Sequence, residues 1–164
     1  MDVGSLTAAF AERLCNAKVK PQSVDFVCYE IDLVLSEYLR HTLREAEVQC
    51  KEVRVGASGR VVQDDFILSH RNGRQPDMFA DAEDTDGGFT HAILNPPYRK
   101  INTRSEHRAA LRRAGIETSN LYTGFMFLAG LRLRDGGEIV AIVPRSFCNG
   151  LYFKPFRELS LIHI

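Results

Sequence analysis

The sequence has no tryptophan, no excess of charge of either sign and no apolar run long enough to cross a membrane. Because 21 basic residues balance 21 acidic ones, any affinity for nucleic acid must come from local clustering of charge. The lack of a signal peptide and of a membrane-length run favours a cytoplasmic protein with no membrane partner.

Cysteine is scarce, and no two cysteines have the close spacing of a zinc-binding pair. The four positions are Cys15, Cys28, Cys50 and Cys148. We interpret them as reduced packing residues and predict no metal site. Hydrophobic residues make up 45% of the chain and charged residues 26%, which is typical of a globular protein. A length of 164 residues allows at most one domain or a piece of one.

The most informative segment is Asn95-Pro96-Pro97-Tyr98, which follows a short apolar run ending at Leu94. The run predicts a buried strand, and the two prolines predict a rigid turn that has few backbone donors. The Asn95 amide oxygen and the Pro96 carbonyl oxygen are suited to accept hydrogen bonds from one planar amino group, and Tyr98 offers a face for stacking. Two such acceptors localise a nitrogen lone pair without a titratable base. A plain Pro-Pro turn at a strand end is the alternative.

This segment resembles the catalytic motif of S-adenosylmethionine-dependent amino-methyltransferases. With residues 92–94 before it and residues 140–147 further on, it resembles the adenine-specific DNA methyltransferases of restriction–modification systems. The resemblance runs along nearly the whole chain. It implies a catalytic role for Asn95, Pro96, Pro97 and Tyr98, S-adenosylmethionine as cofactor, and double-stranded DNA with a flipped adenine as partner.

Two expected cofactor contacts lie in the first third of the chain. Gly4 precedes a predicted helix that ends at about Leu14, and the resemblance places it in the tail of a glycine-rich cofactor loop. Glu30 stands at the carboxyl end of the predicted strand 24–29, a position at which a carboxylate is suited to bind two ribose hydroxyls. Asp32 is an alternative for that role, and the other reading of Glu30 is a charge at a helix start.

The remaining expected contacts depend on the resemblance. It implies that Asp65 accepts from the cofactor's adenine amino group, that Phe66 lies against the purine and that Asn95 also contacts the cofactor. Without it, Asp65 marks a turn and Phe66 a core residue. We interpret residues 56–59 as a hairpin tip between two short strands.

A basic stretch follows the motif, with only Glu106 opposing it within the stretch. It comprises Arg99, Lys100, Arg104, His107, Arg108, Arg112 and Arg113. It is suited to contact DNA phosphates, and Arg99 and Lys100 are nearest to the motif; a solvated helix face is the equal alternative. The resemblance also puts an aromatic side chain against the far face of the flipped base, for which Phe153 is the candidate, with core packing as the alternative.

Strands and helices alternate along the chain, which predicts an α/β fold with a mostly parallel sheet and helices on both faces. Further helices are expected over 33–45 and 121–133, an exposed connection over 71–88, and a buried strand over 138–143. The resemblance implies a Rossmann-like class I methyltransferase fold. Residues 1–164 would then be a partial catalytic domain that lacks its first, central strand and a target-recognition domain.

The leading functional prediction is methyl transfer to the N6 amino group of adenine in DNA. Methylation of an RNA base or of a protein glutamine amide remains open, and so does an inactive fragment or binding module with part of the fold. If the central strand is absent, we expect residues 1–164 alone to be marginally stable, to bind the cofactor poorly and to be inactive.

Overall fold

The computed structural model describes residues 4–69 and 88–145, and the chain divides into two compact units, Met1–Ser69 and His70–Ile164. Phe153 lies outside the described residues. Residues 146–147, the end of the segment 140–147 that resembles the DNA methyltransferases, also lie outside them. The same holds for the predicted connection over 71–88, except for its last residue.

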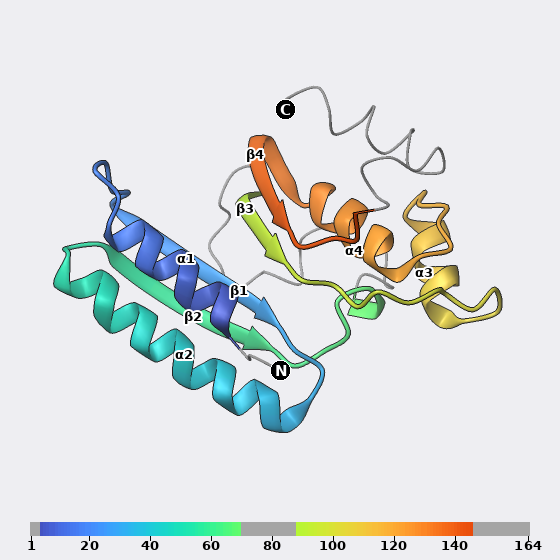
Figure 1. The fold of residues 1–164 in the computed structure, drawn as a ribbon, viewed down its shortest axis with the longest axis horizontal. Coiled ribbons are helices and arrows are strands. Elements are labelled where there is room, and N and C mark those ends of the chain that lie inside the picture. Colours follow the sequence, from blue (N-terminus) through green and yellow to red (C-terminus); the bar gives the residue numbers. More distant parts are fainter. Residues whose placement is uncertain (1–3, 70–87, 146–164) are drawn as a thin grey trace. The chain divides into compact units, whose positions relative to one another are not determined.

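The first unit has a β1–α2–β2 crossover preceded by one helix. Its elements are α1 (Ser5–Cys15), β1 (Ser23–Tyr29), α2 (Leu33–Glu52) and β2 (Gly56–Val62). The two strands run parallel with an unbroken register from Ser23↔Gly56 to Tyr29↔Val62 (Figure 1). A parallel pair requires a long connection, and α2 provides it.

The hairpin predicted at residues 56–59 is wrong, because these residues are the first half of β2. Gly59 serves helix packing and not a turn. A Cβ atom on Gly59 would approach Leu43 Cδ2 to 2.9 Å, so the missing side chain lets α2 lie close to the strand.

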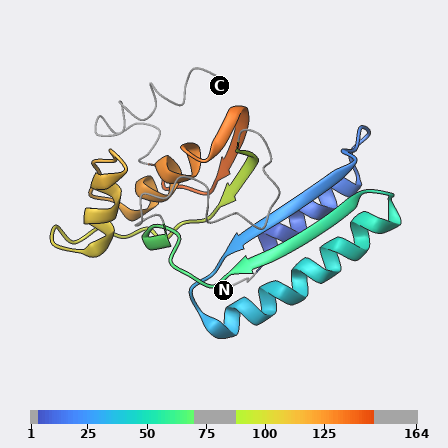
Figure 2. The ribbon, with the colours of Figure 1, turned by 180° about the vertical axis from the view of Figure 1, so that it is seen from behind.

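Both helices of this unit pack on one face of its sheet. Their common core is built from buried and half-buried side chains of all four elements: Phe10 and Ala11 of α1, Val24, Phe26 and Cys28 of β1, Leu43 and Ala46 of α2, and Ala57 and Val61 of β2. The view from behind shows the two strands in front of α1 (Figure 2). The predicted helix from Gly4 is confirmed. The second helix is longer than predicted, because Ala46 and Cys50 continue the buried stripe of Leu39 and Leu43.

The second unit contains β3 (Phe89–Leu94), α3 (Glu106–Arg113), α4 (Leu121–Gly130) and β4 (Leu133–Ala141). Strands β3 and β4 are parallel, with a register shift between Phe89 and His91. Helix α4 packs on one face of this pair, where Tyr122 and Met126 meet side chains from both strand ends. These are the strands and the helix that support the motif turn.

Two details of this unit correct the sequence predictions. The predicted helix over 121–133 ends at Gly130, and the next residue, Leu131, is 62% exposed. Strand β4 spans Leu133–Ala141, so it begins and ends earlier than the strand predicted over 138–143. Within the described residues its outer face is uncovered, since Val140 is 59% exposed.

The α/β class and the parallel pairing are confirmed, and all strand pairs among residues 4–69 and 88–145 are parallel. These strands form two two-stranded sheets, β1–β2 and β3–β4. A single sheet with helices on both faces stays a prediction. Across the part of the chain that the structure describes, no helix has the length and apolar character of a membrane span.

Candidate functional site

Glu30 lies directly beyond the carboxyl end of β1, as predicted. Its backbone N–H donates to Val62 O at 3.1 Å, which extends the ladder by one residue. Its Oε1 accepts from Asp32 N at 2.9 Å. Asp32 itself is the cap of α2, because its Oδ1 accepts from Val34 N and Leu35 N. Asp32 Oδ1 is thus engaged by the helix cap and Glu30 Oε1 by Asp32 N, while the second oxygen of each carboxylate has no protein partner within the described ranges.

Asp65 and Phe66 follow the carboxyl end of β2. Asp65 Oδ1 accepts from Ile67 N and Leu68 N, both at 2.9 Å, and so shapes the turn after the strand. The half-buried Phe66 ring meets Tyr29 edge-on, with ring centroids 5.1 Å apart.

Gly4 caps the start of α1 with φ at 85°. A Cβ atom there would lie 2.8 Å from Thr42 Oγ1, so both the conformation and the contact with α2 require glycine. Thr7 in the first turn lies against Cys28, the second-last residue of β1, with Oγ1 and Sγ 3.7 Å apart. The start of α1 is thus near the carboxyl ends of β1 and β2 (Figure 1), the end at which Glu30, Asp65 and Phe66 are found.

The motif turn follows the last ladder bond of β3, in which Ile142 N donates to Leu94 O at 3.0 Å. Pro96 is buried, while Asn95, Pro97 and Tyr98 are exposed. The Pro97 carbonyl is occupied by Arg99 N at 3.1 Å. In contrast, the Pro96 carbonyl receives no hydrogen bond from the described residues and keeps its acceptor capacity.

Tyr98 is fixed at both its hydroxyl and its ring. The hydroxyl oxygen lies 2.7 Å from the Ile142 carbonyl oxygen and 3.1 Å from Asn95 Oδ1. The ring meets the buried Tyr122 at an interplanar angle of 88°, with centroids 6.1 Å apart. Tyr98 is still 52% exposed, so it offers a held aromatic surface beside the two acceptors of the turn.

The structure therefore gathers the sequence-predicted residues in two groups. Gly4, Glu30, Asp65 and Phe66 lie at one end of the first unit's sheet, and residues 95–98 form the turn of the second unit. The cofactor contact predicted for Asn95 stays a prediction.

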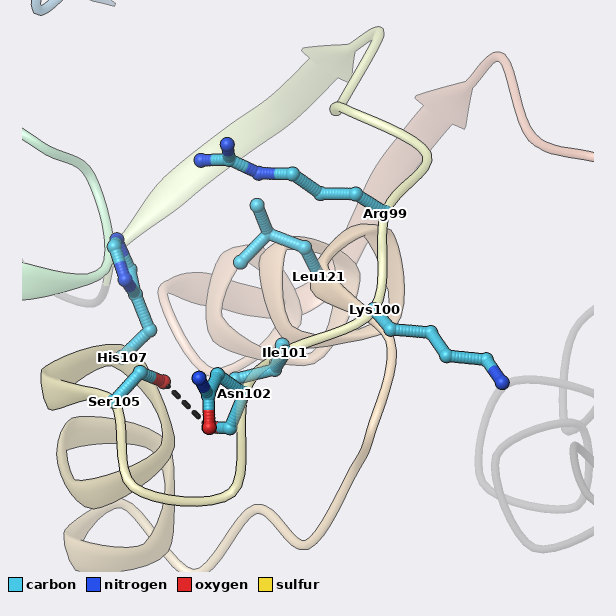
Figure 3. A pocket seen from close by; sticks show the side chains of 7 residues that line it. All are labelled: Arg99, Lys100, Ile101, Asn102, Ser105, His107 and Leu121. Carbon is cyan, nitrogen blue, oxygen red and sulfur yellow. Dashed lines mark hydrogen bonds between the residues drawn. The ribbon is translucent and has the colours of Figure 1, made fainter.

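The chain beyond the turn is anchored on the start of α4. Ile101 N donates to Ser119 O at 2.7 Å, and Leu121 N donates to Arg99 O at 2.9 Å. An open pocket of about 210 Å³ lies here (Figure 3). Its lining residues are Arg99, Lys100, Ile101, Asn102, Ser105, His107 and Leu121. In Figure 3 the Arg99 guanidinium extends over Leu121 toward the side of His107, and Lys100 extends the opposite way.

The sequence interpretation missed Glu117, an acidic residue that pairs with two arginines of the basic stretch. Arg112 Nε donates to it at 2.9 Å, and Arg108 forms a second ion pair with it. The hydrogen bond from Arg112, followed by that from Arg108, holds the pKa of Glu117 below its ordinary value. The sequence did contain a signal for this pairing, because Glu117 is the first acidic residue after the arginines at 112 and 113. Arg99 and Lys100 have no ion-pair partner among the described residues.

The cysteines that the structure describes are free thiols. Burial raises the pKa of Cys28, and burial together with Cys15 raises that of Cys50 to about 11. Both shifts disfavour the metal-binding thiolate. Residues 4–69 and 88–145 contain no group of three potential metal ligands.

Comparison with known proteins assigns the family. The Eco57I restriction-modification methylase family matches residues 19–163. The type II methyltransferase M.BsuBI of Bacillus subtilis is 44% identical over 156 residues, which is 95% of this chain and 30% of that protein. M.PstI of Providencia stuartii, also a type II methyltransferase, is 40% identical over 160 residues, 97% of this chain and 30% of that protein. The chain thus spans about 30% of the length of these relatives, and no solved structure matches it. The chain belongs to the Eco57I restriction-modification methylase family.

Proposed function

We propose that this chain is part of the catalytic domain of a DNA methyltransferase that methylates the N6 amino group of adenine with S-adenosylmethionine. The observation that carries the proposal is the turn at residues 95–98. It combines the Pro96 carbonyl, the Asn95 side chain and the half-exposed Tyr98 ring in a chain of this family. The relatives are named as type II methyltransferases, which supports the same activity.

The turn supplies hydrogen-bond acceptors and a stacking surface. A planar amino group between the Asn95 amide oxygen and the Pro96 carbonyl donates one N–H to each. This fixes the group's orientation and localises the nitrogen lone pair, so the nitrogen is presented as a nucleophile without prior loss of a proton. Tyr98 holds the base by stacking, which is sequence-tolerant and strong enough to retain an unpaired base.

The residues of the first unit fit the adenosine part of S-adenosylmethionine. The second Glu30 oxygen is available for ribose hydroxyls, and the Phe66 ring is half-buried at the same sheet end. Asp65 follows β2 at this end and remains the candidate to accept from the adenine amino group. The start of α1 at Gly4 presents backbone N–H groups suited to a carboxylate. When bound, S-adenosylmethionine supplies an electrophilic methyl group.

A base in a duplex cannot reach the turn, so the target adenine must leave the stack, which costs a few kcal/mol. Arg99 and Lys100 follow the turn directly, and neither has an ion-pair partner in the described part of the chain. We assign these two side chains to DNA phosphates, since cations there offset the cost of the distorted duplex. Phe153 remains the candidate for the far face of the base.

The test is transfer of tritiated methyl groups to unmethylated double-stranded DNA by the full-length gene product that carries this sequence. We expect the label in N6-methyladenine after digestion of the DNA to nucleosides. Label in cytosine, RNA or protein glutamine would reject the assigned substrate. A folded, cofactor-binding protein that labels none of these would reject the activity.

A further inference from the structure

The hydrogen bonds of Tyr98 determine which way the Asn95 amide must face. The Tyr98 hydroxyl lies near two oxygens, the Ile142 carbonyl at 2.7 Å and Asn95 Oδ1 at 3.1 Å. A hydroxyl has one proton, so it donates fully to only one of them. The shorter distance is the usual length of an O–H···O bond, whereas the longer one is outside the usual range. The proton therefore belongs to the bond with Ile142.

Once that proton is committed, the Tyr98 oxygen faces Asn95 with lone pairs only. An amide oxygen opposite it would be repelled, while an amide N–H would be accepted. Rotating the Asn95 amide by 180° exchanges its oxygen and nitrogen and changes no other contact, because its second polar atom has no protein partner within the described ranges. The amide nitrogen then faces Tyr98, and the oxygen faces away with its acceptor capacity unused.

We infer that the Tyr98 hydroxyl is a positioning group: it accepts from the Asn95 amide nitrogen, donates to the Ile142 carbonyl, and so presents the Asn95 oxygen to the target nitrogen. This inference rests on the proposed function only for the identity of the target. Ile142 is itself fixed, since its N–H donates to Leu94 O at 3.0 Å. Ile142, which follows β4, thereby sets through Tyr98 the orientation of the Asn95 amide, which follows β3.

The test is a double-mutant cycle on methyl transfer by the full-length protein. Tyr98→Phe keeps the stacking ring and removes the hydroxyl, so we expect kcat to fall about three- to tenfold, the effect of freeing one side chain. Asn95→Asp has an oxygen at both ends of the side chain and needs no orientation. In that background Tyr98→Phe should change kcat by less than about twofold. An equal loss in both backgrounds would overturn the positioning role.

A second measurement is independent of catalysis. With the hydroxyl accepting from Asn95, the side-chain NH₂ protons lie near the Tyr98 ring, and we expect nuclear Overhauser contacts between them. The Asn95→Asp spectrum identifies the amide signal by its loss. An assigned NH₂ signal with no contact to the Tyr98 ring would overturn the inference even in an active enzyme. Clear contacts in an enzyme that methylates nothing would support the positioning and reject the proposed function instead.

Discussion

Replacement of Glu30 tests most sharply the cofactor contact that we propose for the first unit. One carboxylate oxygen of Glu30 is engaged by Asp32 N, and the other is available in the described part of the chain. If the available oxygen binds ribose hydroxyls, Glu30→Ala removes a hydrogen bond to a charged group, worth about 1.5–3 kcal/mol. Affinity for S-adenosylmethionine should then fall roughly 10- to 150-fold.

The structure also separates this effect from a loss of stability. Glu30→Ala deletes the acceptor for Asp32 N as well, whereas Glu30→Gln keeps an oxygen that can retain that bond. We therefore expect Glu30→Gln to unfold like the wild type but to bind the cofactor more weakly, by less than Glu30→Ala. Asp32→Ala is the matched control, because it removes the α2 cap at a cost of about 0.5–2 kcal/mol in stability without touching the proposed ribose contact.

Isothermal titration calorimetry of the full-length protein measures the affinities, and denaturant unfolding measures the stabilities. Equal affinity of Glu30→Ala and the wild type for S-adenosylmethionine would rule out the ribose contact of Glu30. An equal loss of affinity in Asp32→Ala would rule it out as well, since the effect would then come from the start of α2.

Three further predictions concern the backbone, the charge cluster and DNA. Gly4→Ala and Gly115→Ala both place alanine at positive φ, but only a Cβ atom on Gly4 would meet a side chain, Thr42 Oγ1 of α2 at 2.8 Å. In denaturant titrations Gly4→Ala should therefore lower the free energy of unfolding by about 1–3 kcal/mol more than Gly115→Ala does. The lowered pKa of Glu117 gives a contribution to stability that is present above its ordinary pKa of 4.5 and lost as pH falls through the lower folded value. Glu117→Gln should remove that acid-side loss, and an unchanged pH profile of unfolding would contradict it. Lys100→Ala should lower the salt dependence of DNA affinity by about one unit of slope, whereas Arg112→Ala, already paired with Glu117, should change it less.

Local patterns were sufficient to predict most of the secondary structure. The run ending at Tyr29 and the run ending at Leu94 form strands because apolar residues cluster there and turn residues follow. The hairpin prediction failed at Gly59, where glycine reflects contact with Leu43 of a different element. No local pattern reports such a contact.

In the candidate site, too, local patterns predicted some residues, whereas contacts between distant elements were not predicted. Asn95 and Tyr98 were predicted from the motif, but the hydrogen bond between the Tyr98 hydroxyl and the Ile142 carbonyl was not, because a backbone carbonyl has no signature in sequence. Glu117 was missed for a related reason, since its pairing with α3 depends on how the chain returns after Gly115. Sequence predicts which groups carry chemistry, and the tertiary structure determines what orients them.

In the function that we propose, the turn at residues 95–98 activates the target amino group. The rate of methyl transfer to DNA by Asn95→Ala in the full-length protein tests this role, with S-adenosylmethionine affinity measured on the same sample. Loss of one preorganised acceptor should lower kcat by about two to three orders of magnitude, with far less change in cofactor affinity. A kcat within tenfold of the wild type would contradict the claim.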